Sequence, residues 1–523
     1  MRQLTKQIDK GEFLQSWNRI KEKLTKHSNV IYYVVLSLIL FLYFFINFSD
    51  AMHKGGRWDM NQHIAMADRF LQGEGFYYSA EEASTTYFPG IAFLAIPVRL
   101  IFGGMTETVM LVLASLIGTA FFYILVRIAT DHTQRRWFSL FLTSAVFFSR
   151  FEYYRYYMNE FKGDSLICIY AFLIINIISK LEKVEIGEEG GSDWKAGYVW
   201  LFILSFLMDI TKQQALYIDV ALGMYLVFTR KLSVKRKMKT LAVMVGGGVL
   251  SLVVMLPIPG FKLLTIDNLN QMPWWDKEHI FDELTTVFSE YQWVYYAVIL
   301  LLILLVLRKV KFSSRHIMWM CVSILFFIAQ LAGGMKIGGN IGNYQAGIVG
   351  LVPFFVIIVF EAIRFFIRDK RQIWITAVIL IVMVLRLSDA MGQASFQNLN
   401  ARSENYKAES EYLSKYYSGE TIMYDSDHYF EVKNSDCIPG MDLYTVPYYL
   451  EEQALDLEKA LQEKRYPVLM IYYGDLKEFD QVEKEYFDRD TYFYKALTDN
   501  YELENHDDIP MGLKNRIYVI KDR

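Results

Sequence analysis

The chain has 523 residues, of which 53% are hydrophobic and 16% aromatic, and its formal net charge is -3. Because the apolar residues form separated blocks of membrane-spanning length, this composition excludes an ordinary soluble protein and predicts a polytopic α-helical membrane protein. The small net charge averages a basic membrane part with an acidic tail, so it gives no reason to expect a nucleic-acid partner.

The Lys and Arg clusters predict the orientation in the membrane. Basic runs follow apolar segments at alternate crossings, as in cytoplasmic loops, at residues 230–239, 308–315 and 364–371. Residues 1–29 are Lys-rich and too long for a cleaved signal peptide, so we expect a cytoplasmic N-terminal segment followed by a signal anchor.

The apolar segments predict a transmembrane domain over residues 30–389 with about eleven crossings. In chain order they lie at 30–48, 107–129, 137–149, 165–181, 198–210, a segment ending at 230, and then 240–257, 292–308, 316–333, 344–366 and 373–389. The apolar segment 91–103 contains Pro97 and is too short to cross, so we expect an interfacial or re-entrant helix within a long first outer loop, residues 49–106.

The C-terminal region, residues 390–523, is soluble in character and predicts a small extracytoplasmic α/β domain. Strands are expected at 421–427, 467–474 and 516–522, and helices at 451–464 and 476–486.

The first outer loop carries the first candidate for catalysis. Asp59 starts a helical pattern at the membrane surface, where a carboxylate would stay ionised and could accept a proton, although a plain N-cap explains it equally well. His63, one turn later, could assist Asp59, contact substrate or bind a metal; a solvated histidine or a structural one are the alternatives. Tyr87 begins a YFPG bend, and Asp68 is expected to be a solvated loop charge.

Later outer segments carry cations and amides that suit an anionic lipid. Lys212 and Gln213 sit in a turn so short that both neighbouring spans hold them at membrane depth, where a phosphate oxygen is a natural partner. Arg155 and Lys162 are further candidates, and snorkelling would also explain the lysine. So are Asp164, which a helix cap would explain, and Lys336, Asn343 and Tyr344 in a Gly-rich loop that matches no P-loop.

In order and position these residues resemble the GT-C superfamily of integral membrane glycosyltransferases, which use polyprenyl-phosphate sugars and include protein O-mannosyltransferases and the lipid A aminoarabinose transferase. The similarity rests on Asp59, the Tyr87–Gly90 return, the Lys162 and Asp164 entry to a span, the Lys212–Gln213 turn, and the Asn343–Tyr344 loop. Many members carry paired acidic residues where this chain has Asp59 followed by Met60, so a divalent metal stays open as a cofactor, but the sequence itself does not support one.

The resemblance implies transfer of a sugar from a polyprenyl-phosphate donor to an acceptor hydroxyl at the outer side of a bacterial plasma membrane. Asp59 would be the base, and inversion is expected. Lys212, Gln213, Lys162 and Arg155 would hold the donor phosphate, whereas His63, Tyr87, Asp164, Asn343, Tyr344 and Lys336 would contact substrate. The acceptor could be a glycan, a lipid or a protein. A transporter, flippase or polymer-handling protein that holds lipid phosphates without breaking a bond is the alternative, although the chain shows no internal repeat.

Overall fold

The computed structural model describes most of the membrane part and fragments of the tail. The described residues are 28–54, 58–73, 75–77, 87–149, 161, 163–188, 194–267, 277–306, 311–335, 345–367, 369–393, 408, 411–412, 415–417, 421–425, 436–440, 459–472, 492–504 and 515–521.

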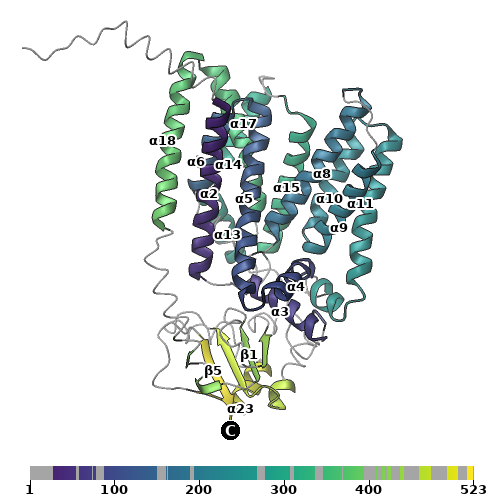
Figure 1. Ribbon diagram of the computed structural model, residues 1–523, viewed down its shortest axis with the longest axis vertical. Coiled ribbons are helices and arrows are strands. Elements are labelled where there is room, and N and C mark those ends of the chain that lie inside the picture. Colours follow the sequence, from purple (N-terminus) through teal and green to yellow (C-terminus); the bar gives the residue numbers. More distant parts are fainter. Residues whose placement is uncertain are drawn as a thin grey trace, which may run out of the picture.

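A bundle of long helices forms the body of the molecule, with a small sheet beyond one end (Figure 1). The helices of the bundle are α2 (Ser28–Lys54), α5 (Thr106–Thr133), α6 (Arg136–Ser149), α8 (Asp164–Glu185), α9 (Lys195–Thr211), α10 (Ala215–Phe228), α11 (Val234–Met255), α13 (Lys277–Glu290), α14 (Gln292–Val306), α15 (Ser314–Gly334), α16 (Gln345–Gly350), α17 (Val352–Phe366) and α18 (Asp369–Gln393). Short 3-10 and π turns lie at Gly103–Met105 and Lys262–Asp267.

The helices confirm a polytopic membrane protein. Within the described residues, seven helical stretches are long and apolar enough to cross a bilayer. Each predicted crossing falls on a helix, but α6, α9, α10 and α14 have 14, 17, 14 and 15 residues and are shorter than these seven. The count of eleven crossings therefore stays a prediction for these four.

The two faces of α2 show how the bilayer acts as solvent for this fold. Leu36, Ile39 and Tyr43 are buried against the bundle, whereas Leu38 and Phe41 are 54% and 60% exposed. These sets alternate at helical spacing, so α2 has one face toward protein and one facing away from it. Large apolar side chains on the outside are unfavourable in water but are suited to lipid, and they recur on α11 and α18.

Two short helices, α3 (Trp58–Gln72) and α4 (Gly90–Phe102), lie across the end of the bundle that faces the sheet (Figure 1). The 13 residues of α4 would extend only about 20 Å, which agrees with the interfacial helix expected at 91–103. Ile64 of α3, Ala95 of α4 and Met110 of α5 share one apolar cluster, which fixes both short helices to the bundle.

An ion pair also joins α3 to α4 and corrects one prediction. Asp68 was expected to be solvated, but it is buried and accepts a hydrogen bond of 2.6 Å from Nε of Arg99. Arg99 also donates to the carbonyl of Gly103, so it fastens the last turn of α4. The sequence did not reveal this pair because its members are 31 residues apart.

The sheet has five strands in the order β2-β1-β3-β5-β4. The strands are β1 (Thr421–Asp425), β2 (Asp436–Gly440), β3 (Val468–Tyr472), β4 (Tyr501–Leu503) and β5 (Asn515–Ile520), with α23 at Tyr492–Asn500. β1 is parallel to β2 and β3, whereas β5 is antiparallel to β3 and β4. The three predicted strands correspond to β1, β3 and β5; β2 and β4 were not predicted.

The expected tail helices are mostly not covered by the described residues. Of the predicted helix 451–464, the described part from residue 459 is helical up to residue 462. The predicted helix 476–486 lies outside the described residues.

The start of α4 needs a residue without a Cβ atom. A Cβ on Gly90 would lie 2.6 Å from the carbonyl oxygen of Ile210 and 2.7 Å from Cα of Thr211, so the backbones of α4 and α9 meet there. We predict that Gly90→Ala lowers the thermal midpoint of the purified protein, with about 1–3 kcal/mol lost to overpacking.

Gly104→Ala is the matched control, because a Cβ there meets nothing within 4 Å. Differential scanning fluorimetry in detergent measures both variants. Equal midpoints for Gly90→Ala and the control would show that the two helices do not require this close approach.

Candidate functional site

A buried ion pair lies at the end of the bundle where α3 and α4 sit. Nζ of Lys212 is 3.0 Å from Oδ1 and 2.8 Å from Oδ2 of Asp164. Lys212 is 5% exposed and Asp164 8%. Burying two charges costs several kcal/mol per ion, which is offset only when the pair has good geometry and further hydrogen bonds. The pair therefore needs neighbours that satisfy its remaining oxygen and hydrogen atoms.

Gln330 of α15 is one such neighbour. Its Nε2 donates to Oδ1 of Asp164 at 2.8 Å, and its Oε1 accepts from the backbone N–H of Gly347 at 2.8 Å. The side chain is 1% exposed and both ends of its amide are engaged. Gln330 thus connects the carboxylate at the start of α8 to α16, which begins directly after the undescribed segment 336–344.

The alternative interpretation of Asp164, as the cap of a helix, is wrong. The N-cap of α8 is Gly163, whose φ is 79°, and no side chain caps it. Asp164 is the first residue of the helix, where a negative charge is favoured by the helix dipole. Its carboxylate is directed to Lys212 and Gln330 rather than to the backbone of its own helix.

Thr211 is the point where three distant segments meet. A Cβ on Gly163 would lie 2.9 Å from Cγ2 of Thr211, and Gly90 approaches the same residue from α4. Lys212 follows in extended conformation, and α10 begins at Ala215. This confirms the tight turn at Lys212 and Gln213. The turn holds Lys212 against the start of α8.

Gln213 is in the turn but outside the ion pair. Its Oε1 is buried and accepts no hydrogen bond from the residues that the structure describes. A buried amide oxygen normally has a donor, so Gln213 is available to a donor that the described part of the chain does not supply.

Helix α3 carries the other predicted residues of this end. Asp59 falls in the first turn of α3, but its side chain lies outside the described residues. His63 is completely buried, which excludes the solvated alternative, and its ring lies 5.1 Å from that of Tyr87. The hydroxyl of Tyr77 donates to the carbonyl of Tyr87 at 2.8 Å. Because burial raises the pKa of Tyr77 well above its usual value, this hydroxyl stays a donor.

The remaining predicted residues are not placed. Arg155, Lys162, Lys336, Asn343 and Tyr344 lie outside the described residues. Of the predicted set, the structure brings Lys212 together with Asp164, and His63 with Tyr87.

Gln330 was not predicted, although the sequence contains a signal for it. Gln330 is a polar residue inside the apolar run of α15, and a polar side chain inside a span is rarely without a partner. What the sequence could not supply is the identity of that partner, because Asp164 is 166 residues away.

Comparison with known proteins identifies solved structures with a similar fold. No known family's sequence profile and no curated protein sequence match the chain. Among solved structures, ArnT from Cupriavidus metallidurans bound to undecaprenyl phosphate matches with a TM-score of 0.51 and 11% identity, over 94% of this chain and 97% of ArnT. ArnT in the apo state matches with a TM-score of 0.51 and 12% identity, over 94% of this chain and 98% of ArnT.

At these identities the likeness is one of fold, and it extends over nearly the whole of both chains. The chain is thus a multi-pass membrane protein with the GT-C fold of ArnT.

Proposed function

We propose that the protein is a membrane glycosyltransferase that moves a sugar from a polyprenyl-phosphate donor to an acceptor hydroxyl at the outer face of the membrane, with inversion. The observation that carries this proposal is the buried Lys212–Asp164 pair at the end of the bundle covered by α3 and α4. It occurs in a chain with the fold of ArnT, whose structure contains undecaprenyl phosphate.

Lys212 can bind a phosphate without leaving Asp164. An ammonium has three N–H donors, and in this structure two directions are taken by the carboxylate oxygens at 3.0 and 2.8 Å. Within the described residues the third donor has no acceptor, and we propose that it binds a phosphate oxygen. Because Lys212 stays paired with Asp164, which neutralises its charge, further cations are needed to balance the phosphate, and Lys162 and Arg155 are the proposed ones.

Asp59 is the proposed base. It lies in the first turn of α3, which is fixed at the same end of the bundle by its apolar contacts with α4 and α5. In this scheme the carboxylate takes the proton of the acceptor hydroxyl while the oxygen attacks the anomeric carbon from the face opposite the phosphate. The C–O bond to the lipid phosphate breaks, and the phosphate leaves with the bonding electrons, stabilised by cations in place of a general acid.

The remaining candidates are proposed to hold the sugar and the acceptor. His63 and Tyr87 lie together beside α3, and Tyr77 fixes the backbone of Tyr87. Gln213 offers its buried amide, and Lys336, Asn343 and Tyr344 belong to the segment that leads into α16. A glycan, a lipid or a protein would serve as acceptor.

The first prediction of this proposal concerns Asp59. Asp59→Asn should abolish transfer from radiolabelled polyprenyl-phosphate sugars, offered as a panel to the purified protein with membrane extract as acceptor, while donor binding is retained. The loss should be at least about 100-fold, since a positioned base contributes that much or more. Asp389→Asn is the control, because Asp389 is an exposed carboxylate on α18. Normal transfer by Asp59→Asn would refute the assignment.

The second prediction separates the structural role of Lys212 from its role in binding. Lys212→Met leaves the buried Asp164 carboxylate without its cation and should destabilise the protein by about 3 kcal/mol. The double variant Lys212→Met/Asp164→Leu should recover most of the thermal midpoint but none of the donor affinity, measured by retention of radiolabelled lipid. Donor binding restored together with stability would mean that Lys212 acts only within the fold.

The third prediction tests whether Gln330 is a positioning residue that acts through Asp164. Gln330→Met keeps the length of the side chain but removes both hydrogen bonds, and we expect kcat/KM for the donor to fall about tenfold. In an Asp164→Asn background the same substitution should have little further effect, because Gln330 acts through Asp164. If the two substitutions lower kcat/KM independently, so that their losses multiply in the double variant, Gln330 does not act through Asp164.

A further inference from the structure

A polar cavity of about 700 Å³ lies at the opposite end of the bundle from Lys212. Asp164 begins α8, whereas the cavity is lined by Ser179, Glu182 and Lys183 near the end of the same helix. At 1.5 Å per residue the two sites are roughly 20–30 Å apart. Five Lys and Arg, four Asp and Glu and two His side chains line the cavity, with Ile186 as the one aliphatic residue.

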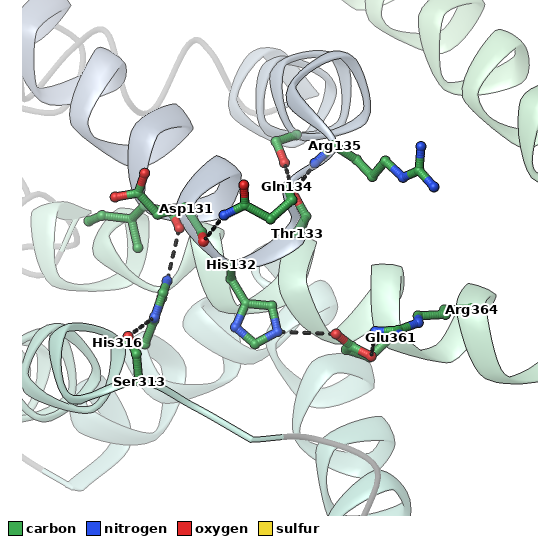
Figure 2. A network of polar contacts seen from close by, with 11 residues as sticks. Asp131, His132, Thr133, Gln134, Arg135, Ser313, His316, Glu361 and Arg364 are labelled. Carbon is green, nitrogen blue, oxygen red and sulfur yellow. Dashed lines mark hydrogen bonds and ion pairs between the residues drawn. The ribbon is translucent and has the colours of Figure 1, made fainter. Parts of the chain in front are cut away.

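Three of the four carboxylates are already engaged. Glu361 contacts Nε2 of His132 at 3.2 Å, and Arg364 approaches the same carboxylate at 3.8 Å, as Figure 2 shows. Asp131 accepts from Nη1 of Arg315 at 2.6 Å. These pairs neutralise two of the four carboxylates of the lining, those of Glu361 and Asp131.

The carboxylate of Glu182 is also satisfied from within the protein. It accepts hydrogen bonds from the hydroxyls of Tyr225 and Thr229, which come from the end of α10 and the residue that follows it. Glu182 is 2% exposed, so little of its charge faces the cavity.

Two cations remain uncommitted. Lys231 and Lys311 line the cavity and are exposed, and their ammonium groups make no hydrogen bond or ion pair with the residues that the structure describes. They come from different loops, one between α10 and α11 and the other before α15. Two ammonium groups from separate loops on one cavity favour an anionic ligand between them.

The N-terminus of α15 adds donors to the same cavity. Ser314, Arg315 and His316 of its first turn all line the cavity. The N-cap residue Ser313 does not cap the helix with its side chain; its Oγ lies against Nδ1 of His316. The first N–H groups of a helix have no intrahelical acceptor, and together with the helix dipole they bind phosphate oxygens.

We propose that this cavity binds a phosphate monoester through Lys231, Lys311 and the N-terminus of α15. A tetrahedral dianion matches two separate ammonium groups and a set of backbone N–H donors better than a planar carboxylate does. The basic run at residues 230–239, expected to be cytoplasmic, lies at this end, where the headgroup of an anionic lipid or a soluble phosphate ester would meet it.

The test measures binding and does not depend on sugar transfer. The full-length protein is titrated with phosphatidic acid in phosphatidylcholine nanodiscs, and separately with glycerol phosphate. Lys231→Gln/Lys311→Gln should weaken binding about fivefold or more, as expected for losing two exposed charge contacts. The matched control is Lys180→Gln/Lys235→Gln, which removes two exposed lysines at the same end that do not line the cavity.

The outcomes separate the two sources of phosphate. Loss of phosphatidic acid binding in the cavity variant alone assigns the site to a lipid headgroup, and the same loss for glycerol phosphate assigns it to a soluble ester. The second measurement is the acetylation of lysines, detected by mass spectrometry. Inorganic phosphate should protect Lys231 and Lys311 from acetylation but should not protect Lys180 and Lys235. If the cavity variant and the control bind both ligands equally, the proposal is overturned.

Discussion

The bidentate contact between Lys212 and Asp164 is the interaction on which the site depends, because two buried charges are tolerated only in a fixed arrangement. Its requirements extend outward from the pair. Asp164 is the first residue of α8, and Gly163 before it has a positive φ. Lys212 follows the end of α9 at Thr211. The lack of a Cβ atom on Gly90 lets α4 approach the same point. Gln330 donates a further hydrogen bond to the Asp164 carboxylate and accepts one from the backbone N–H of Gly347, so the position of the carboxylate also depends on α16.

The bilayer explains why, among the residues that the structure describes, the charged clusters of the bundle lie at its two ends. Outward-facing positions such as Leu38 and Phe41 are exposed and apolar, which lipid permits and water does not. Charged side chains gather instead where helices begin and end, at Lys212 and Asp164 on one side and around Glu361 and Arg315 on the other. The two ends share helices α8 and α15 but have different charge patterns.

The membrane part of the fold was predictable because each span has to satisfy the same hydropathy requirement by itself, so α2, α8 and α15 are visible as separate segments. Two strands were missed for a local reason. β4 has three residues and β2 contains Pro439 and Gly440, so neither shows an alternating pattern of useful length.

The site was predictable in part. Lys212 and Asp164 stood out because each lies at the end of an apolar run, but nothing in either segment says that they meet. Asp68 was expected to be a solvated loop charge, and its partner, Arg99, could not be identified because it lies in a different helix. Pairings of this kind depend on tertiary packing, which the spacing of residues along one segment does not encode.

The contact between Gln330 and Asp164 also has a consequence for biogenesis. During synthesis Asp164 and Lys212 can meet once α9 and the turn after it have entered the membrane, but the amide of Gln330 arrives with α15, and its own acceptor contact needs Gly347 of α16. A nascent chain released before residue 347 would therefore contain most of its spans and the charged pair, yet lack the support that holds the carboxylate in place.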